Sequence, residues 1–205
     1  MNLKNIVLPS RIEKNTRNYS ETYGEFSVYP LERGFGITLG NALRRVLVSS
    51  LEGAAIWGVR VEGVLHELSS IPGIVEDMPE IIINLKRVVL KRRDEETVEG
   101  VCKLEVHDPA EVTAAKIQTS PGFEVVNKDL YLFSLKDKKN VRMELMVKCG
   151  RGYHPSNSHE APDDDPQFIP IDSLFSPVVK VSFDVEEQRV GQRTDYDKLV
   201  MKVNT

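Results

Sequence analysis

The sequence predicts an α+β fold in which strands outnumber helices, and three observations lead to this class. Apolar and polar residues alternate with the period of a strand in several segments along the chain. A long apolar stripe with helical spacing occurs once, and one further segment begins like a helix. Strand and helix patterns do not alternate regularly, so we expect mainly antiparallel sheet rather than a parallel βαβ arrangement.

The clearest predicted helix follows a glycine-containing turn at residues 33–36. Apolar side chains then recur at i, i+3, i+4, i+7 and i+8, and they are Leu39, Ala42, Leu43, Val46 and Leu47. This spacing predicts a helix with one apolar stripe for packing. At about 100° per residue, the opposite face carries Asn41, Arg44, Arg45 and Val48.

A second helix is predicted to begin at Asp77, because this capping residue is followed by Pro79 and then by Glu80, three positions on. The residues that would form its buried side are Ile81, Ile82 and Leu85. The helix would therefore pack against the core along one side only.

Strands are predicted in the remaining alternating segments. A short strand at 25–29 would end at Pro30, and one within 54–65 would place Trp57, Val59 and Val61 on one face. Further strands are expected at 98–106, 130–135 and 141–148. Two C-terminal strands would bury Val179, Val181, Phe183 and Val185, and then Asp197, Leu199, Met201 and Val203. Residues 150–170 contain four prolines, two glycines and an acidic run, and are predicted to form a long loop.

Composition indicates a globular protein of 205 residues, 40% hydrophobic and 28% charged. The net charge is −4, and a chain that binds DNA by itself is normally strongly basic, so no direct DNA contact is expected. No apolar run approaches the ~20 residues that span a bilayer, and the N-terminus lacks an apolar signal core. Two cysteines, Cys102 and Cys149, form no disulfide framework. We therefore expect a cytoplasmic protein without membrane contact.

Patterns that carry catalytic or cofactor chemistry have simpler explanations here. The turn reads G-x-G-x-x-x-G from Gly34 to Gly40, whereas a dinucleotide loop reads G-x-G-x-x-G within a βαβ unit. His154 and His159 lack metal-ligand spacing, so a solvated loop is expected. The pair Glu76–Asp77 suits acid–base chemistry, but helix capping explains it equally well. We expect no catalytic residue, metal site or cofactor.

The face of the first helix opposite its apolar stripe remains unexplained by these patterns. A solvated face would carry Lys, Glu and Gln. Here an apolar residue, Val48, is surrounded on the helix surface by Asn41, Arg44 and Arg45. An apolar anchor with a polar rim is typical of a protein–protein contact. Small Gly40 would let another backbone approach, so the sequence predicts a docking surface for another protein.

Residues 30–45, Pro-Leu-Glu-Arg-Gly-Phe-Gly-Ile-Thr-Leu-Gly-Asn-Ala-Leu-Arg-Arg, closely resemble the signature of the N-terminal domain of the bacterial RNA polymerase alpha subunit. Further blocks resemble this family in the same order along the chain, at residues 63–67, 76–77, 84–86, 112–115, 150–155, 176–178 and 192–199. The resemblance therefore covers nearly the whole chain.

The resemblance implies a chain of two parts. A dimerisation subdomain, an antiparallel sheet with helices, would combine residues 1–51 and 176–205, and a mostly β subdomain, residues 52–175, would be inserted in it. In the family, an alpha homodimer forms first and carries the two large subunits, beta and beta prime, which hold the catalytic aspartates and magnesium. This chain would then be a non-catalytic subunit of DNA-directed RNA polymerase that supports transcription through assembly.

The resemblance also implies roles for particular residues. The beta subunit would be contacted by Asn41, Arg44, Arg45 and Val48. The dimer interface would contain Phe35, Leu39, Leu43, Val46 and Leu47. The region facing beta prime would include Arg189, Gln192 and Arg193, and a loop that serves activators as a target would include Asp163, Asp164 and Asp165.

The end of the sequence departs from the family pattern. Family members continue into a helix that crosses to the partner, a linker and a DNA-binding domain, whereas this chain stops at Thr205, so we expect these parts to be missing. Two alternatives remain open at this point. One is a free-standing binding module of the same fold that enters no polymerase, and the other is a small nucleotide-dependent enzyme that uses the glycine turn.

Overall fold

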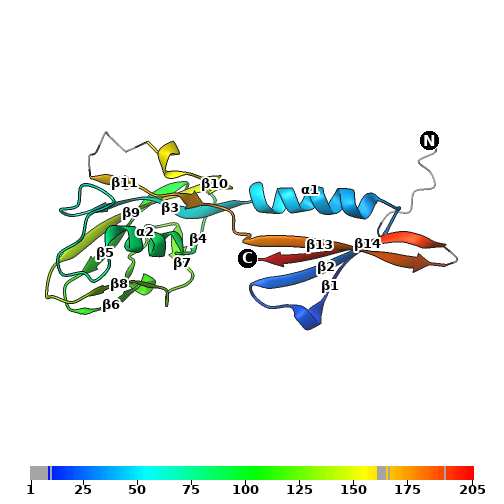
Figure 1. Ribbon diagram of the computed structural model, residues 1–205, viewed down its shortest axis with the longest axis horizontal. Coiled ribbons are helices and arrows are strands. Elements are labelled where there is room, and N and C mark those ends of the chain that lie inside the picture. The colour runs from blue at the N-terminus through cyan, green and yellow to red at the C-terminus, as the bar shows by residue number, and fades with distance from the viewer. Residues whose placement is uncertain (1–8, 10, 161–164, 166, 192) are drawn as a thin grey trace. The chain divides into compact units, whose positions relative to one another are not determined.

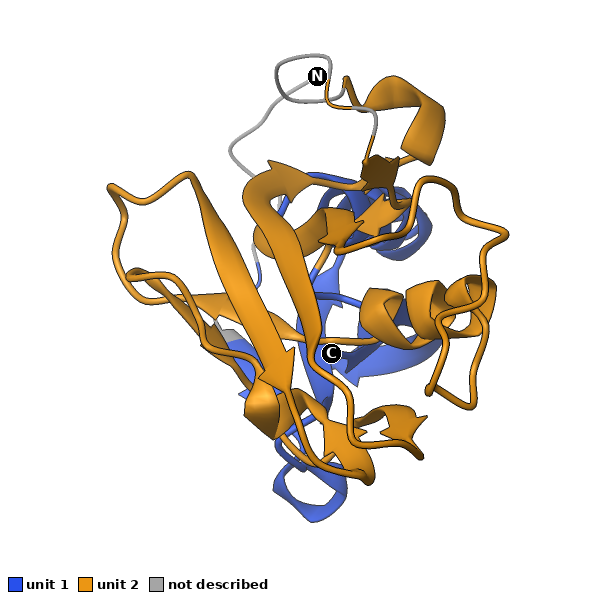
Figure 2. Ribbon diagram, turned by 90° about the vertical axis from the view of Figure 1, so that its left-hand side faces the viewer, with its two compact units in different colours: residues 1–51, 177–205 blue, residues 52–176 orange. Residues whose placement is uncertain are grey.

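The computed structural model describes residues 9, 11–160, 165, 167–191 and 193–205. The chain divides into two compact units, one formed by residues 1–51 with 177–205 and the other by residues 52–176 (Figure 2). Each unit has its own hydrophobic core. Strands predominate in both, which confirms the predicted α+β class. Within the described residues, no helix is long and apolar enough to cross a membrane.

The first unit is a four-stranded antiparallel sheet with one helix on a face (Figure 1). The strands follow the order β1 (Arg11–Lys14), β2 (Tyr23–Leu31), β14 (Arg193–Asn204) and β13 (Lys180–Val190). A short 3-10 helix, η2 (Thr16–Asn18), connects β1 and β2. The long helix α1 (Phe35–Ser49) contacts β13 and β14. A helix from the N-terminal part of the chain therefore packs on two strands from the C-terminal part.

The core of the first unit lies between α1 and the sheet. Alternate residues of β14 and β13 supply it, as the periodicity predicts, and among them Leu199 is fully buried. Val179 was expected in the same row but lies outside the strand and is 72% exposed. The opposite face of the sheet carries charged residues, and Lys198 and Lys202 there form ion pairs with Glu186 and Asp184 of the neighbouring strand.

The predicted end of β2 at Pro30 is wrong, because the strand continues to Leu31. Val28 pairs with Leu199 of β14, and Leu31 pairs with Asp197. Two residues of β2 therefore oppose one residue of β14, which is the arrangement of a β-bulge. Proline is tolerated at such a bulge because no ladder hydrogen bond needs its missing N–H.

The second unit is built on a six-stranded antiparallel sheet. Its order is β5 (Glu99–Val106), β9 (Val141–Arg151), β3 (Glu52–Val61), β4 (Leu90–Arg92) and β7 (Phe123–Val125), with β11 (Phe168–Pro170) also paired to β3. Two-stranded sheets join β6 (Ala110–Thr113) to β8 (Tyr131–Leu135) and β10 (Tyr153–His154) to β12 (Ser173–Leu174). The helices are α2 (Met78–Lys86) and the 3-10 turns η3 (Ala114–Lys116) and η4 (Ser156–Ser158).

Most predicted elements of the second unit are confirmed. Helix α2 begins after Asp77, and its residues Ile81, Ile82 and Leu85 are buried. Strands β5, β8 and β9 occupy the segments predicted from alternation. Both cysteines lie in strands: Cys102 is fully buried and Cys149 is half-buried, and burial raises the pKa of each thiol.

The predicted face of β3 is wrong at Trp57. The pairing of β3 with β9 shifts register between Ile56 and Gly58, which places a bulge at Trp57. Ile56, Val59 and Val61 therefore belong to the core, whereas Trp57 stands outside it and contacts Phe168. A bulge inserts one extra residue into the strand, so residues before and after it no longer follow the same alternation between the two faces of the sheet.

The long loop predicted at 150–170 is partly structured. Strand β9 runs to Arg151, and β10, η4 and β11 fall inside the segment. Asp163 and Asp164 lie outside the described residues, whereas Asp165 is described.

Candidate protein-interaction surface

Helix α1 begins at a turn that is held by a strand. Gly34 adopts a left-handed conformation with φ of 87°, which suits glycine. The backbone N–H groups of Gly34 and Gly36 donate to the same carboxylate oxygen of Asp197 on β14, at 2.8 and 3.0 Å. Asp197 thus places a negative charge at the positive end of the helix dipole. It also occupies the N–H groups that a phosphate would need, so this turn fits helix capping better than nucleotide binding.

Glycines let α1 approach the sheet closely. A Cβ atom on Gly36 would lie 2.7 Å from Cγ1 of Val185, and one on Gly40 would lie 2.5 Å from Cδ2 of Phe183. The prediction that Gly40 admits the backbone of another protein is therefore wrong, because its own sheet fills that space. Ring and methyl groups of β13 pack where the helix has no side chain.

The apolar stripe of α1 is only partly used inside its own unit. Leu39 and Leu47 are half-buried and pack against the core of the sheet. Phe35 and Val46 are about half exposed, and Leu43 is exposed as well. Helix α1 lies closest to the sheet at Gly36 and Gly40, and not at the middle of its apolar stripe. One flank of the helix consequently presents apolar side chains on the surface of this unit.

The other flank of α1 borders an open hollow of about 390 Å³ next to β13. The residues that line it are Arg44, Arg45, Val48, Ser49 and Val181. Val48 is 40% exposed, so its side chain is available within this unit. The hollow and its lining residues are called the α1 hollow below.

The α1 hollow is positively charged. The Arg44 guanidinium donates to Asn41 Oδ1 at 3.2 Å and lies 5.7 Å from the centroid of the Phe183 ring. The Arg45 guanidinium is exposed, and among the described residues no hydrogen bond or ion pair engages it. Neither arginine has a carboxylate partner in the described part of the chain. This combination of two cations and an apolar anchor suits a partner with acidic and apolar groups.

Ile37 belongs to the same flank, and the docking surface predicted from the sequence did not include it. It precedes Asn41, Arg44 and Val48 by four, seven and eleven positions, a spacing that returns to one side of a helix. Its side chain is 58% exposed. Extending the helical spacing toward the N-terminus would have found it.

The residues expected to face beta prime lie elsewhere on the first unit. Arg189 is exposed near the end of β13, where its Nε donates to the carbonyl of Gly191 at 3.0 Å. Val181 of the α1 hollow lies eight residues earlier on the same strand, which corresponds to about 26 Å. The structure therefore does not bring these two regions together. Gln192 and the side chain of Arg193 lie outside what is described.

Asp165, the described member of the acidic run, is engaged inside the second unit. It forms an ion pair with Arg60 of β3 and accepts the backbone N–H of Gln167 at 3.0 Å. These contacts, first the backbone hydrogen bond and then Arg60, lower the pKa of Asp165. Arg60 also binds Glu144 of β9 at 2.7 Å. Asp165 thus anchors its segment to the sheet.

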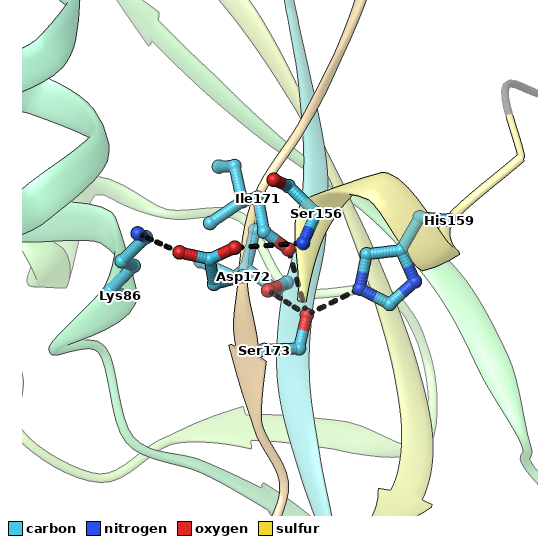
Figure 3. Close-up of polar contacts among 7 residues, drawn as sticks. Lys86, Ser156, His159, Ile171, Asp172 and Ser173 are labelled. Atoms are coloured by element: carbon cyan, nitrogen blue, oxygen red, sulfur yellow. Dashed lines mark hydrogen bonds and ion pairs between the residues drawn. The ribbon is translucent and has the colours of Figure 1, made fainter. Parts of the chain in front are cut away.

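The expectation of a solvated loop around His159 is wrong. The residue is only 8% exposed, and its Nε2 lies 3.2 Å from Oγ of Ser173 (Figure 3). His154 stacks against it, with ring centroids 6.2 Å apart. Among the described residues, no group of three metal-ligating side chains is brought together.

Ser173 and His159 do not form a catalytic triad with Asp172. Figure 3 shows the Asp172 carboxylate between Lys86 and Ser156, which donate to it at 2.7 Å each. The hydrogen bond from Lys86 is the main reason that the pKa of Asp172 falls to about 2. Ser173 is 1% exposed, and its hydroxyl lies within hydrogen-bond distance of two backbone carbonyls. The cluster fits a structural clamp.

Comparison with known proteins gives one matching family model, described as the RNA polymerase Rpb3/RpoA insert domain, over residues 59–176. Among similar proteins, the DNA-directed RNA polymerase subunit alpha of Desulforudis audaxviator is 50% identical over 184 residues, covering 90% of this chain and 58% of the relative. The subunit of the same name from Syntrophomonas wolfei is 47% identical over 196 residues, covering 95% and 61%. That from Carboxydothermus hydrogenoformans is 46% identical over 190 residues, covering 93% and 60%. The chain thus spans about 60% of the length of these relatives.

Proposed function

The chain belongs to the RNA polymerase alpha-subunit family, and on that basis we propose that it is a non-catalytic assembly subunit of DNA-directed RNA polymerase. It forms a homodimer that carries the beta and beta prime subunits for transcription in the cytoplasm. The observation that carries this proposal is the α1 hollow, where two arginines without carboxylate partners among the described residues surround Val48.

The apolar flank of α1 is the proposed dimer surface. Phe35, Leu43 and Val46 are exposed on it, whereas Leu39 and Leu47 also pack on the sheet of their own unit. A second copy of the chain would remove the exposed apolar groups from water, which is the main driving force for association. A twofold dimer uses the same patch on both copies, so one helix flank suffices for the contact.

The α1 hollow on the other flank is the proposed docking site for beta. Val48 would be the apolar anchor, and Arg44 and Arg45 would bind carboxylates at its rim. Arginine is favoured in such places because its planar guanidinium binds a carboxylate through two parallel hydrogen bonds. The two flanks lie on different sides of one helix, so one copy can bind a second copy and a large subunit together.

Two further assignments rest on the family alone. Residues Arg189, Gln192 and Arg193 would face beta prime, and the acidic run that includes Asp165 would be a target for activators. The bonds of Asp165 to Arg60 and Gln167 favour a supporting role for this residue, with any activator contact made by Asp163 and Asp164.

Co-purification from cells of the source organism tests the proposal. The full chain is expressed in two tagged forms, and capture of one tag recovers the other tag together with beta and beta prime. Arg45→Ala should fold normally and dimerise but recover no beta, whereas Arg87→Ala, an exposed arginine of the second unit, should behave like the wild type. Normal recovery of beta by Arg45→Ala would contradict the assigned surface.

The same experiment separates the alternative of a free-standing binding module. Such a module would retain the fold and dimer, but neither tagged form would recover the large polymerase subunits. That outcome would overturn the proposed assembly role as a whole.

A further inference from the structure

Residues 153–160 form a short strap across the second unit, made of β10, η4 and His159. We propose that this strap is a pH-sensitive element, held in place by neutral His159 and released when the imidazole takes up a second proton. The proposal rests on the clamp around His159 and is independent of the proposed assembly function.

His159 is held at both ring nitrogens. Its Nδ1 lies 3.2 Å from Nζ of Lys148 on β9, and its Nε2 lies 3.2 Å from Oγ of Ser173 on β12. The ring also meets the Trp57 indole edge-on, with centroids 5.5 Å apart. Contacts from three different strands therefore fix one side chain of the strap.

The contacts of the two ring nitrogens of His159 allow only one placement of the imidazole proton. The Lys148 ammonium has only donors, so Nδ1 of His159 must be the acceptor. Nε2 then carries the single imidazole proton and donates to Ser173 Oγ. The Ser173 hydroxyl in turn donates to the carbonyl of Ile56 or of Ile171, at 3.0 and 3.1 Å. The clamp therefore accepts the neutral imidazole with Nε2 protonated.

Two groups next to His159 that can carry a positive charge, Lys148 and His154, oppose its protonation. Lys148 faces it from β9, where the ammonium also lies 4.4 Å from the centroid of the Trp57 ring. His154 faces it from β10. Asp172 and a hydrogen bond with the backbone of Ile171 act in the opposite direction and raise the pKa of His159, but the two Asp172 oxygens already bind Lys86 and Ser156. Burial first, and then Lys148 and His154, lower the pKa of His159.

Protonation would remove the clamp and add repulsion. An imidazolium has no acceptor, so its Nδ1–H would point at the ammonium of Lys148. Because the folded-state pKa of His159 is lowered, the strap is stabilised fully above the ordinary histidine value of about 6.5 and less as the pH falls below it. Departure of His159 would open one side of Trp57, the single tryptophan of the chain.

Hydrogen exchange and Trp57 fluorescence of the full 205-residue chain, measured from about pH 8 to about pH 5, test the proposal. As the pH falls, we expect the protection of the 153–160 amides against exchange to decrease by about tenfold. This decrease is measured after correction for the intrinsic exchange rate and relative to the amides of η3. The Trp57 emission should change over the same pH range. In His159→Gln, the amide oxygen can accept from Lys148 and the amide N–H can donate to Ser173. This variant should keep the strap closed at both pH values.

Control and second variants distinguish a specific clamp from general acid instability. His107→Gln changes an exposed histidine and should keep the wild-type response. Lys148→Met removes the cation that faces Nδ1, so the midpoint of the transition should move to higher pH. A wild-type strap without pH response, an unchanged response in His159→Gln, or an unmoved midpoint in Lys148→Met would each overturn the proposal.

Discussion

Gly40 of α1 lies so close to Phe183 of β13 that a Cβ atom would come within 2.5 Å of the ring. This contact sets the distance between the helix and its sheet. It also explains why the long side chains of α1 lie along the two flanks, where they are available to other proteins.

Replacing Gly40 with alanine should destabilise the chain. Alanine favours helix over glycine by about 1 kcal/mol, but overpacking against Phe183 costs ~1–3 kcal/mol, so we expect a net loss of about 1 kcal/mol. Urea unfolding followed by circular dichroism measures it. Thr38→Ala, at an exposed position of the same helix, serves as the control, and a stabilised Gly40→Ala would contradict the close approach.

The cap formed by Asp197 predicts a second stability effect. Asp197→Ala leaves the backbone N–H groups of Gly34 and Gly36, at the N-cap and in the first turn of α1, without their acceptor, and losing a cap typically costs about 1 kcal/mol. Asp197→Asn keeps an acceptor but loses the favourable charge at the helix N-terminus, so it should lose less. Equal losses in the two variants, compared by urea unfolding, would argue against the hydrogen bonds as the cause.

Ile37 should contribute to the proposed beta contact. Ile37→Asp places a carboxylate on the flank of the α1 hollow, where a partner with acidic groups would be repelled, and recovery of beta should fall by at least about tenfold. Ile83→Asp is a matched control, because Ile83 is 57% exposed on helix α2 of the other unit. Unchanged recovery of beta by Ile37→Asp would exclude Ile37 from the interface.

The Asp172 carboxylate predicts a stability change in acid. Its pKa is about 2 in the folded chain, below the ordinary value of 3.8, so the carboxylate stabilises the fold above about pH 4 and ceases to do so as the pH falls toward 2. Asp172→Asn should therefore be less stable than the wild type at neutral pH, and the difference should shrink in this acid range. Urea unfolding at a series of pH values measures the difference, and a difference independent of pH would contradict the assignment.

The sequence predicts where helices and strands lie better than it predicts which of their side chains face the core. Helix α1 and the strands β13 and β14 follow directly from periodicity, because every second or every third to fourth residue must be apolar to fill a one-sided core. Glycine contributes nothing to such a pattern, so the sequence predicts the wrong neighbour for Gly40, and it does not predict that Gly36 and Gly40 are where α1 lies closest to its own sheet. The bulge at Trp57 similarly shifted the phase of β3.

The clamp around His159 could not be predicted because it depends on distant residues. Its partners lie on β9, eleven positions earlier, and on β12, fourteen positions later. Neither the spacing nor the composition of the 150–170 segment indicates which histidine is buried. The exposed arginines of α1 were easier to predict, since a helix places them by angle alone.

A photo-crosslinking amino acid at position 48 tests the central claim most directly. Introduced in the full chain in living cells, it should form a crosslink to the beta subunit, because Val48 is proposed to be the apolar anchor of the α1 hollow. The same amino acid at position 83 should form none. A position-48 probe that labels no protein, or labels only proteins other than beta, would contradict the account.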